Sequence, residues 1–422
     1  MSNRNIGSIL SISLLLLSLP LVSQLARATQ TRRDTVVAND FPGADIGAKI
    51  NAGDKALGAK VGDIVVRGGG TIATPIVISS GHALRLGAGT YTARTANVPI
   101  LLQSNSSLIG SGWDSIIVES NAPGQFTVIG AYKSTLKNGD ADSNLIIRDV
   151  QIKGANPGFN SAPQAVSLGN CSNCTVDHVW INGTRSIGIA VGGGSFLGHW
   201  AENVKVVNCL FTRVASQNLA LVNGRNIVFE GNRFMAPGQK EGPGTTSIDL
   251  EPNQNTDRME NVTIRNNYID HRGSEMPTTG NGIVVQSGAG TTLVGNIVVE
   301  NNTIIGGENK GVVTNVLSNA IYVMGATMQG VTVRNNTITR TGQAGIRVSG
   351  SRITVINNKL TDVGGGGTPG FIIEGLVDSR ITGNTFTYTG NGPSSATMAF
   401  SGSNKRNFIQ NNPGFGVSSA IQ

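Results

Sequence analysis

A nine-residue segment recurs without gaps through the last half of this 422-residue chain. Its copies span residues 203–211, 226–234, 261–269, 296–304, 330–338, 352–360 and 378–386. The seventh position is Cys209 in the first copy and an asparagine in the others, namely Asn232, Asn267, Asn302, Asn336, Asn358 and Asn384. Amides stacked at one turn position can hydrogen-bond from copy to copy, as they do in stacked strands. The repeat therefore predicts a stack of similar coils.

Between these copies lies a second set of short segments with apolar residues at alternate positions. The segments span residues 188–192, 218–222, 247–251, 282–286, 320–324, 345–349 and 370–374, so that one coil takes 25 to 38 residues. Strands of successive coils that stack in the same direction form a parallel β-helix. The 57 glycines and the 5% of aromatic residues suit many short strands joined by tight turns. The predicted fold class is all-β, a single-stranded parallel β-helix.

The first residues have the features of an export signal. Arg4 precedes an apolar run over residues 6–22, and Ala26-Arg27-Ala28 follows, which is typical of a secretory signal peptide cut after Ala28. No later stretch is apolar enough to span a bilayer. We therefore expect residues 1–28 to be a signal peptide and the mature protein to be secreted, periplasmic or on the cell surface.

The mature chain is predicted to form one domain. Residues 29–39 are expected to be a flexible N-terminal segment, and residues 40–422 the parallel β-helix domain. The regular coils are expected over residues 144–412, where the Asn-containing repeat begins and ends.

A helix is predicted at the start of this domain. Ile46, Ile50 and Leu57 recur at helical spacing after Asp45, a residue type that favours the N-cap position. A solenoid needs its open end covered, because an uncovered terminal coil exposes unpaired backbone and bare core. Residues 40–60 are therefore predicted to be a capping helix.

Charge and cysteine content narrow the range of partners. Without Arg4 and Arg27, 30 basic residues face 25 acidic ones, and no dense basic run occurs. This mild positive balance fits an acidic polysaccharide and does not indicate nucleic acid.

In an oxidising compartment Cys171 and Cys174 can form a disulfide that leaves Cys209 outside it. A zinc site is not expected, because the spacing offers no fourth ligand.

Two carboxylates share the predicted outer face of one strand. In the segment Ser247-Ile248-Asp249-Leu250-Glu251-Pro252, Ile248 and Leu250 alternate with Asp249 and Glu251. The outward column through Asp249 also contains Arg347 three coils away, or roughly 14 Å at the usual strand spacing. The longest connections of the regular region lead into coils at or next to Asp249, and long loops beside a polar strand face predict a groove. These connections are residues 233–246, 268–281 and 305–319.

This segment admits three interpretations. Like charges this close raise one pKa and give a proton donor beside an ionised partner, so the candidate catalytic residues are Asp249, Glu251 and Arg347. Alternatively, Asp249 and Glu251 hold Ca²⁺ against an acidic sugar while Arg347 or Lys240 acts on the substrate. The third interpretation is a solvated strand face with two ordinary surface acids. The candidate substrate-binding residues are Gln286, Tyr322, Lys240 and His271.

The sequence resembles a known group of exported proteins. The signal peptide, the N-terminal helix, the strand-turn-Asn-strand coils and the final Asn411-Asn412-Pro413-Gly414 are similar to secreted right-handed parallel β-helix proteins of the pectate-lyase-like superfamily. The resemblance covers nearly the whole mature chain and implies a right-handed coil. That superfamily contains lyases, hydrolases, epimerases and non-enzymes, so function has to come from the site.

The chain departs from the better-defined enzymes of that superfamily. Polygalacturonases combine an Asn-Thr-Asp segment with Asp-Asp, Gly-His-Gly and Arg-Ile-Lys, whereas this chain has only Asn255-Thr256-Asp257, in a loop after the strand. The Arg-x-Pro-x-x-Arg signature of calcium-dependent pectate lyases is also missing. We expect an exported protein that cleaves a uronate-containing or other polysaccharide as a lyase or glycoside hydrolase. The alternative is a non-catalytic carbohydrate-binding or cell-surface scaffold, and the sequence does not indicate an oligomeric state.

Overall fold

The computed structural model describes residues 33–120, 127–135, 141–155, 163–193, 200–238, 246–274, 280–288, 293–306, 317–325, 327–390 and 394–418. The chain divides into two compact units, residues 1–33 and 34–422, and the second contains the helices and strands given below. The predicted signal peptide lies outside the described residues. Over the part of the chain that is described, no helix is long and apolar enough to cross a membrane.

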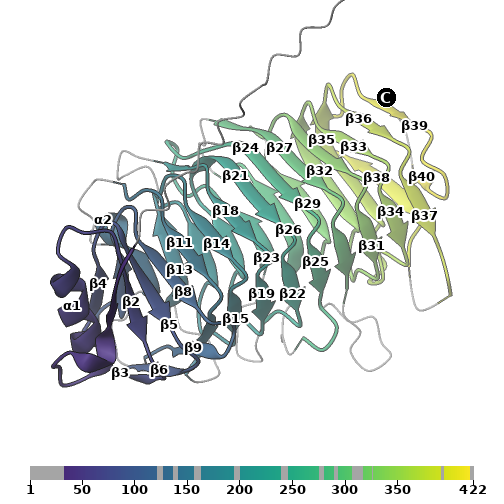
Figure 1. Cartoon of the computed structure of the whole chain (residues 1–422). Helices are drawn as coiled ribbons and strands as arrows, with labels where there is room; N and C mark the ends of the chain where they lie inside the picture. Colours follow the sequence, from purple (N-terminus) through teal and green to yellow (C-terminus); the bar gives the residue numbers. More distant parts are fainter. Residues whose placement is uncertain are drawn as a thin grey trace, which may run out of the picture. The chain divides into compact units, whose positions relative to one another are not determined.

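A helix covers the first coil of the second unit (Figure 1), as the sequence predicts. This helix, α1 (Ile46–Leu57), packs against the first strands and buries Ile46, Ile50 and Leu57. Asp45 caps it, because its carboxylate accepts the backbone N–H groups of Gly47 and Ala48.

A strand precedes the cap. β1 (Asp34–Val37) is followed by the 3-10 helix η1 (Ala38–Asp40), and β1 pairs in parallel with β2 (Gly62–Val66). Residues 34–37 were predicted to belong to a flexible segment. Backbone pairing with β2 instead makes them the first strand of a sheet, a long-range contact that local composition does not reveal.

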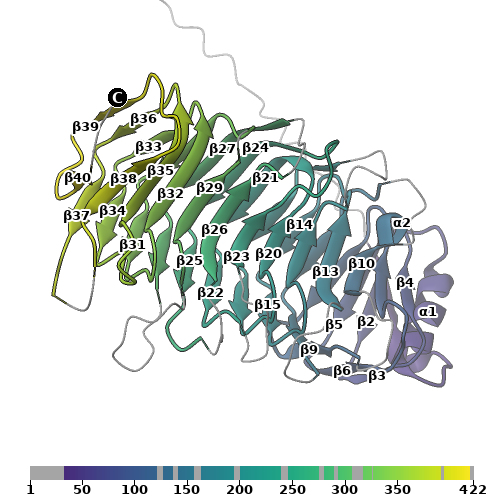
Figure 2. The ribbon, with the colours of Figure 1, turned by 180° about the vertical axis from the view of Figure 1, so that it is seen from behind.

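Three parallel sheets, here called A, B and C, run along the stack, and Figures 1 and 2 show the coils in chain order. Each complete coil contributes one strand to A, then one to B, then one to C. Sheet A contains β1, β2, β5 (His82–Leu86), β8 (Ser107–Gly110), β11 (Ile146–Arg148), β14 (Thr175–Asp177), β17 (Ala201–Glu202), β18 (Lys205–Val207), β21 (Gly224–Glu230), β24 (Arg258–Arg265), β27 (Leu293–Glu300), β30 (Val331–Arg334), β33 (Thr354–Ile356), β36 (Arg380–Thr382) and β39 (Phe408–Gln410).

Sheets B and C complete the coils. Sheet B contains β3 (Gly70–Ile72), β6 (Gly89–Ala93), β9 (Ser115–Val118), β12 (Gln151–Lys153), β15 (Trp180–Asn182), β19 (Leu210–Thr212), β22 (Arg233–Met235), β25 (Tyr268–Asp270), β28 (Thr303–Ile305), β31 (Thr337–Thr339), β34 (Lys359–Thr361) and β37 (Thr385–Thr387). Sheet C contains β4 (Ile76–Ile78), β7 (Ile100–Leu102), β10 (Thr127–Ala131), β13 (Gln164–Gly169), β16 (Ile189–Val191), β20 (Leu219–Leu221), β23 (Thr246–Leu250), β26 (Asn281–Gln286), β29 (Ile321–Met324), β32 (Ile346–Ser351), β35 (Phe371–Val377), β38 (Thr397–Ser401) and β40 (Gly416–Ser418). A short helix, α2 (Tyr132–Thr135), follows β10.

The core is made of inward columns, one residue per coil. Because side chains alternate across a strand, each coil places its apolar residues on the inner face, where the next coil covers them. From β15 to β34 of sheet B this column is fully buried and aliphatic apart from two phenylalanines, whose rings stack with their centroids 4.7 Å apart. Its members are Ile181, Phe211, Phe234, Ile269, Ile304, Ile338 and Leu360.

A buried ladder of asparagines follows the corner between sheets A and B. The Oδ1 of each asparagine accepts both the side-chain and the backbone N–H of the asparagine one coil earlier, as at Asn302, which bonds Asn267 at 2.9 and 3.0 Å. The residue before each ladder position adopts a left-handed backbone, for example Asn301 with φ 55°. This corner geometry confirms the predicted ladder. Its members are Asn232, Asn267, Asn302, Asn336, Asn358, Asn384 and Asn412.

A second, exposed ladder marks the start of sheet A. Asn261 donates through Nδ2 to Asn226 at 3.1 Å, and the series includes Asn105, Asn144, Asn173, Asn203 and Asn296. These residues also have left-handed backbones, which asparagine tolerates better than most residues.

The structure contains the disulfide that the sequence left open. Cys171 and Cys174 form a disulfide, and Cys209 is buried outside it. Cys209 takes the ladder position one coil before Asn232, whose Oδ1 accepts the Cys209 N–H. Burial raises the pKa of the Cys209 thiol to about 12, so it stays protonated at neutral pH.

Candidate functional site

Asp249 lies on β23, near the middle of sheet C, with the strand neighbours that the sequence alignment of coils predicts. It is in register with Ala220 of β20 and Val284 of β26, and the column continues through Tyr322 and Arg347. Glu251 follows β23 directly and donates its N–H to the carbonyl of Leu221. Residues two apart on a strand share a face, with Cα atoms about 6.6 Å apart.

This part of sheet C is more closed than the sequence suggested. Asp249 was expected on an open outer face, but it is only 6% exposed, and its register neighbours Ala220 and Val284 are buried as well. Gln286 contributes to the cover and donates through Nε2 to Asp249 Oδ1 at 3.3 Å. Alternation fixes the face on which a residue lies, whereas neighbouring coils decide how much of that face they cover.

The burial changes the acidity of both carboxyls. Burial first and the charge of Glu251 second raise the pKa of Asp249 to about 7, although hydrogen bonds from Gln217 and Gln286 lower it. Burial also raises the pKa of Glu251, which is half-buried. A carboxyl with a pKa near neutrality can donate a proton to a substrate, and its partner can accept one.

Gln217 is a site residue that the sequence analysis missed. Its Nε2 donates to Glu251 Oε1 at 3.3 Å, and its own carbonyl oxygen accepts the hydroxyl of Ser216 at 2.6 Å. It precedes β20 in a turn, so strand alternation does not assign it to a face. The register between β20 and β23 begins only at Leu219, so no periodic signal in the sequence assigns Gln217 to this site.

Arg347 is directed away from the two carboxylates. Its guanidinium forms a bidentate ion pair with Glu374 of the following coil, at 2.9 and 2.8 Å. It also lies over the ring of Tyr322 at 4.8 Å from the centroid, so these three residues form a cluster of their own. Arg347 and Tyr322 share the column of Asp249 as expected, but the structure does not bring them to it. Glu374, on the neighbouring strand β35, is the carboxylate that Arg347 pairs with in place of Asp249 or Glu251.

Of the other two predicted binding residues, the structure describes His271. His271 was expected beside an open groove, but it is fully buried and its Nε2 lies 3.2 Å from the hydroxyl of Ser247. The loop that contains His271 turns inward at the corner after β25. The sequence analysis treated loop residues as exposed to solvent, and so it did not predict this burial. Lys240 lies outside the described residues.

The segment Asn255-Thr256-Asp257 has a structural role. Asp257 is buried, and its Oδ2 accepts the backbone N–H groups of Asn253 and Gln254, both at 2.8 Å. These bonds close the turn after β23, which agrees with the view that the segment only mimics the polygalacturonase motif.

A metal site is not evident over the described ranges. No group of three or more His, Cys, Asp or Glu side chains within them is placed to hold a metal ion. Asp249 and Glu251 together offer far fewer oxygens than the six to eight ligands of Ca²⁺. The calcium interpretation of this pair is therefore not supported.

Family comparisons match two parts of the chain. The family described as right handed beta helix region matches residues 138–325. The family described as periplasmic copper-binding protein (NosD) matches residues 260–421. The described residues do not fit a copper site, which needs grouped imidazole or sulfur ligands, because His82, His178 and His271 lie on different coils. No curated protein sequence matches this chain.

Several solved structures share the fold at low sequence identity. The A-module of a mannuronan C-5 epimerase from Azotobacter vinelandii is 15% identical, with a TM-score of 0.63 over 92% of this chain and 98% of that one. A family 28 exopolygalacturonase of Yersinia enterocolitica is 15% identical, with a TM-score of 0.57 over 90% and 79%. A tailspike protein of E. coli bacteriophage HK620, solved with a pentasaccharide, is 16% identical, with a TM-score of 0.53 over 87% and 70%.

These likenesses agree with the three continuous parallel sheets. The chain is a right-handed parallel β-helix, the fold that it shares with these proteins.

Proposed function

We propose that this chain is an exported enzyme that hydrolyses a polysaccharide on the outer face of sheet C. The observation that carries the proposal is that Asp249 is buried beside a second carboxyl on the same face, a burial that raises the pKa of Asp249 to about 7. Acid–base catalysis at neutral pH needs one carboxyl kept protonated and another that ionises more readily. Solved proteins of the same fold are named for action on mannuronan, for exopolygalacturonase activity and for a bound pentasaccharide, which supports a polysaccharide as the substrate class.

Export is part of the proposal. It is supported by the hydrophobic N-terminal segment followed by Ala26-Arg27-Ala28 and by the match to a family described as periplasmic. The disulfide between Cys171 and Cys174 also fits an oxidising compartment.

In the proposed reaction, Asp249 is the general acid and Glu251 the general base. The Asp249 proton goes to the glycosidic oxygen as the bond from that oxygen to the anomeric carbon breaks. A water oxygen bonds to the anomeric carbon, and the proton of that water goes to Glu251. Gln217 and Gln286 donate to the two carboxylates and so orient them.

Hydrolysis is favoured over β-elimination by the position of Arg347. Elimination from a uronate needs a cation at the sugar carboxylate to stabilise the carbanion that forms when the adjacent carbon loses its proton. Arg347 and Lys240 were the two candidates for acting on the substrate; Arg347 is paired with Glu374, and Lys240 lies outside the described residues. The acid pair needs no such cation for hydrolysis of a glycosidic bond.

The test is a screen of the purified mature protein against polymannuronate, polygalacturonate and neutral glucans. Reducing ends and absorbance near 235 nm are followed together, and Asp249→Asn and Glu251→Gln are assayed beside the wild type. We expect new reducing ends without the ultraviolet signal, and a loss of at least about a thousandfold in both variants. An ultraviolet signal would show elimination instead. Polymer binding with no turnover, unchanged by either substitution, would support the non-catalytic scaffold.

A further inference from the structure

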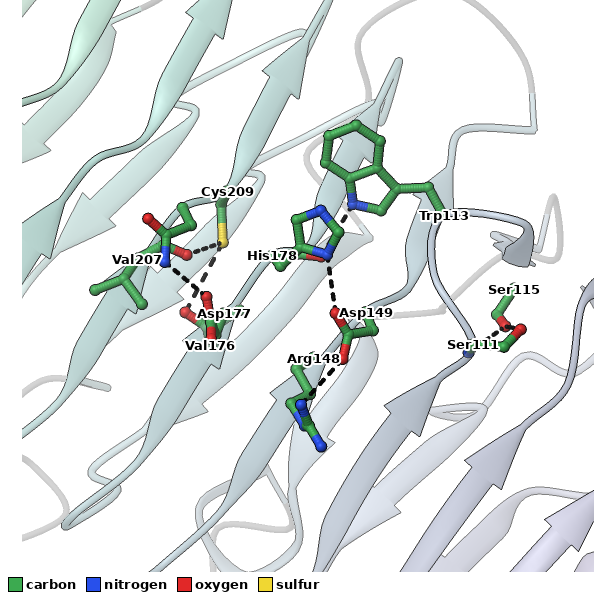
Figure 3. Close-up of polar contacts among 11 residues, drawn as sticks. Ser111, Trp113, Ser115, Arg148, Asp149, Val176, Asp177, His178, Val207 and Cys209 are labelled. Atoms are coloured by element: carbon green, nitrogen blue, oxygen red, sulfur yellow. Dashed lines mark hydrogen bonds and ion pairs between the residues drawn. The ribbon is translucent and has the colours of Figure 1, made fainter.

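Three aromatic side chains meet on the outside of the corner between sheets A and B. Asp249, by contrast, lies on a later coil and on sheet C. Trp113 comes from the turn between β8 and β9, and His178 from the turn two coils later, between β14 and β15. Their rings stack with centroids 4.7 Å apart and an angle of 24° between planes. Trp180, the first residue of β15, lies 5.5 Å from Trp113 at a tilt of 56°. Figure 3 shows Trp113 reaching over His178.

Protein hydrogen bonds hold these rings in place. Trp113 Nε1 donates to the carbonyl of His178 at 2.9 Å, and Trp180 Nε1 donates to the hydroxyl of Thr212 at 2.8 Å. With both indole N–H groups satisfied, the rings are fixed before any ligand arrives, and a preorganised surface loses little entropy on binding. Neither tryptophan is fully buried, so part of each ring is open to solvent.

A polar edge accompanies the rings. His178 Nδ1 lies 2.8 Å from Asp149 Oδ1, and the two side chains are 48% and 27% exposed (Figure 3). Arg148 lies 3.3 Å from the second carboxylate oxygen of Asp149. An exposed acceptor, an imidazole and a guanidinium therefore stand together beside an aromatic surface.

The backbone at this corner indicates that His178 and Asp149 are deviations from the repeat. Both residues have left-handed backbones, with φ 54° and 58°. The same corner position is asparagine in six later coils, at Asn208, Asn266, Asn301, Asn335, Asn357 and Asn411, and glycine in two, at Gly231 and Gly383. Positions where a chain departs from its own local rule are expected at functional sites. Asp149 and His178 are the departures that carry a polar or aromatic side chain, and the turn of Trp113 contacts both.

We propose that Trp113, Trp180, His178 and Asp149 form a second, non-catalytic binding site for a pyranose ring of a polysaccharide. A pyranose presents a face of C–H groups that packs on an aromatic ring, and a rim of hydroxyls that needs hydrogen-bond partners. A ligand site of this kind combines an apolar surface with a few placed polar groups. The indole rings supply the surface, and Asp149, His178 and Arg148 supply partners for the hydroxyls. Such a site holds the polymer on the solenoid independently of sheet C.

The experiment measures polymer binding in the Asp249→Asn background, so that no substrate is consumed and the outcome does not depend on the proposed hydrolysis. Retention is measured by affinity electrophoresis in gels that contain polymannuronate, polygalacturonate or dextran. The test variants are Trp113→Ala and His178→Asn. His178→Asn restores the residue found at later corners, so its unfolding temperature is expected to match that of the parent.

We expect retention on at least one gel, and a drop of about fivefold or more in both variants, in line with the loss of one aromatic contact. Trp200→Phe removes the one tryptophan outside the cluster and serves as the matched control, with retention unchanged. In that control, the remaining fluorescence comes from Trp113 and Trp180 and should change when polymer is added. Retention on none of the three gels, or equal retention of both variants and their parent, would overturn the proposal.

Discussion

Asp249 and Glu251 are the same kind of group two residues apart, yet their surroundings differ. Asp249 lies under Gln286 between buried neighbours, whereas Glu251 follows the strand end and is half-buried. Desolvation disfavours a carboxylate, so the more deeply buried member keeps its proton to higher pH. The division into acid and base therefore comes from burial, not from residue type.

The first prediction concerns the stability cost of ionising Asp249. Its folded-state pKa of about 7 exceeds the ordinary value of 3.8, so the native protein loses stability as pH rises from about 4 to 7. The change corresponds to at most about 4 kcal/mol. Asp249→Asn should be more stable than wild type at pH 8, and the difference should shrink toward pH 4. Urea unfolding at both values measures it, and a constant difference would contradict the raised pKa.

The second prediction tests Asp249 as the proton donor. Gln286 donates to Asp249 and so favours its ionised form. Gln286→Met keeps the size of the cover and removes the donated hydrogen bond, so it should raise the pKa of Asp249 and move the alkaline limb of the activity profile to higher pH. Tyr322→Phe, on the next strand but in the Arg347 cluster, is the control and should leave that limb in place. An alkaline limb that stays still in Gln286→Met would assign the proton transfer to another group.

At the scale of elements, the corner asparagines join one coil to the next. Asn302 is buried and accepts two N–H groups of Asn267, while its Nδ2 donates to the carbonyl of Ile264 and to Asn336. Each asparagine thus satisfies backbone groups that a tight corner would leave unpaired. Buried polar groups without partners are costly, so the ladder is strongly coupled to the fold.

The third prediction contrasts the two ladders. Asn302→Ala leaves several buried donors and acceptors without partners and should lower the free energy of unfolding by about 3 kcal/mol. Asn261→Gly, in the exposed ladder, keeps the left-handed backbone accessible, as Gly330 does at the equivalent position, and should change stability by less than about 1 kcal/mol. Chemical denaturation of both variants measures the difference. Equal losses in the free energy of unfolding would show that the buried ladder stabilises the protein no more than the exposed one.

At the scale of the whole molecule, the solenoid depends on its cap. The Asp45 carboxylate accepts N–H groups from Gly47, Ala48, Ala73 and Thr74 and the hydroxyl of Thr74. It thereby fixes the start of α1 to the turn between β3 and β4. The buried pair of His82 and Asp54 holds the other end, with His82 Nε2 at 2.9 Å from the carbonyl of Lys60.

The fourth prediction is that Asp45→Ala opens the capped end first. Loss of the N-cap bonds and the contacts to the β3–β4 turn should cost about 2 kcal/mol. Burial acts to raise the pKa of Asp45, but its hydrogen bonds lower it below the ordinary value, so this contribution is present at neutral pH and fades as pH falls into the acid range. Hydrogen exchange should accelerate in residues 46–86 before the coils around Asn302. Uniform acceleration along the chain would contradict a separate role for the cap.

The sequence by itself determined the repeating part of this protein. The alternation of apolar residues, the in-frame asparagines at 232, 267, 302, 336, 358 and 384, and the helical spacing after Asp45 are local patterns. In a solenoid each coil contacts mainly its neighbours, so local patterns specify register, and the column from Ala220 through Asp249 to Arg347 was predictable.

Only the tertiary structure decided what each outward residue meets. It buried Asp249, turned His271 inward to Ser247, joined Arg347 to Glu374 and brought Gln217 to Glu251 across 34 residues. These contacts depend on loops of unequal length and on the reach of side chains between coils, and neither has a period in the sequence. Periodicity determines the scaffold, and non-periodic contacts between coils determine the chemistry of its faces.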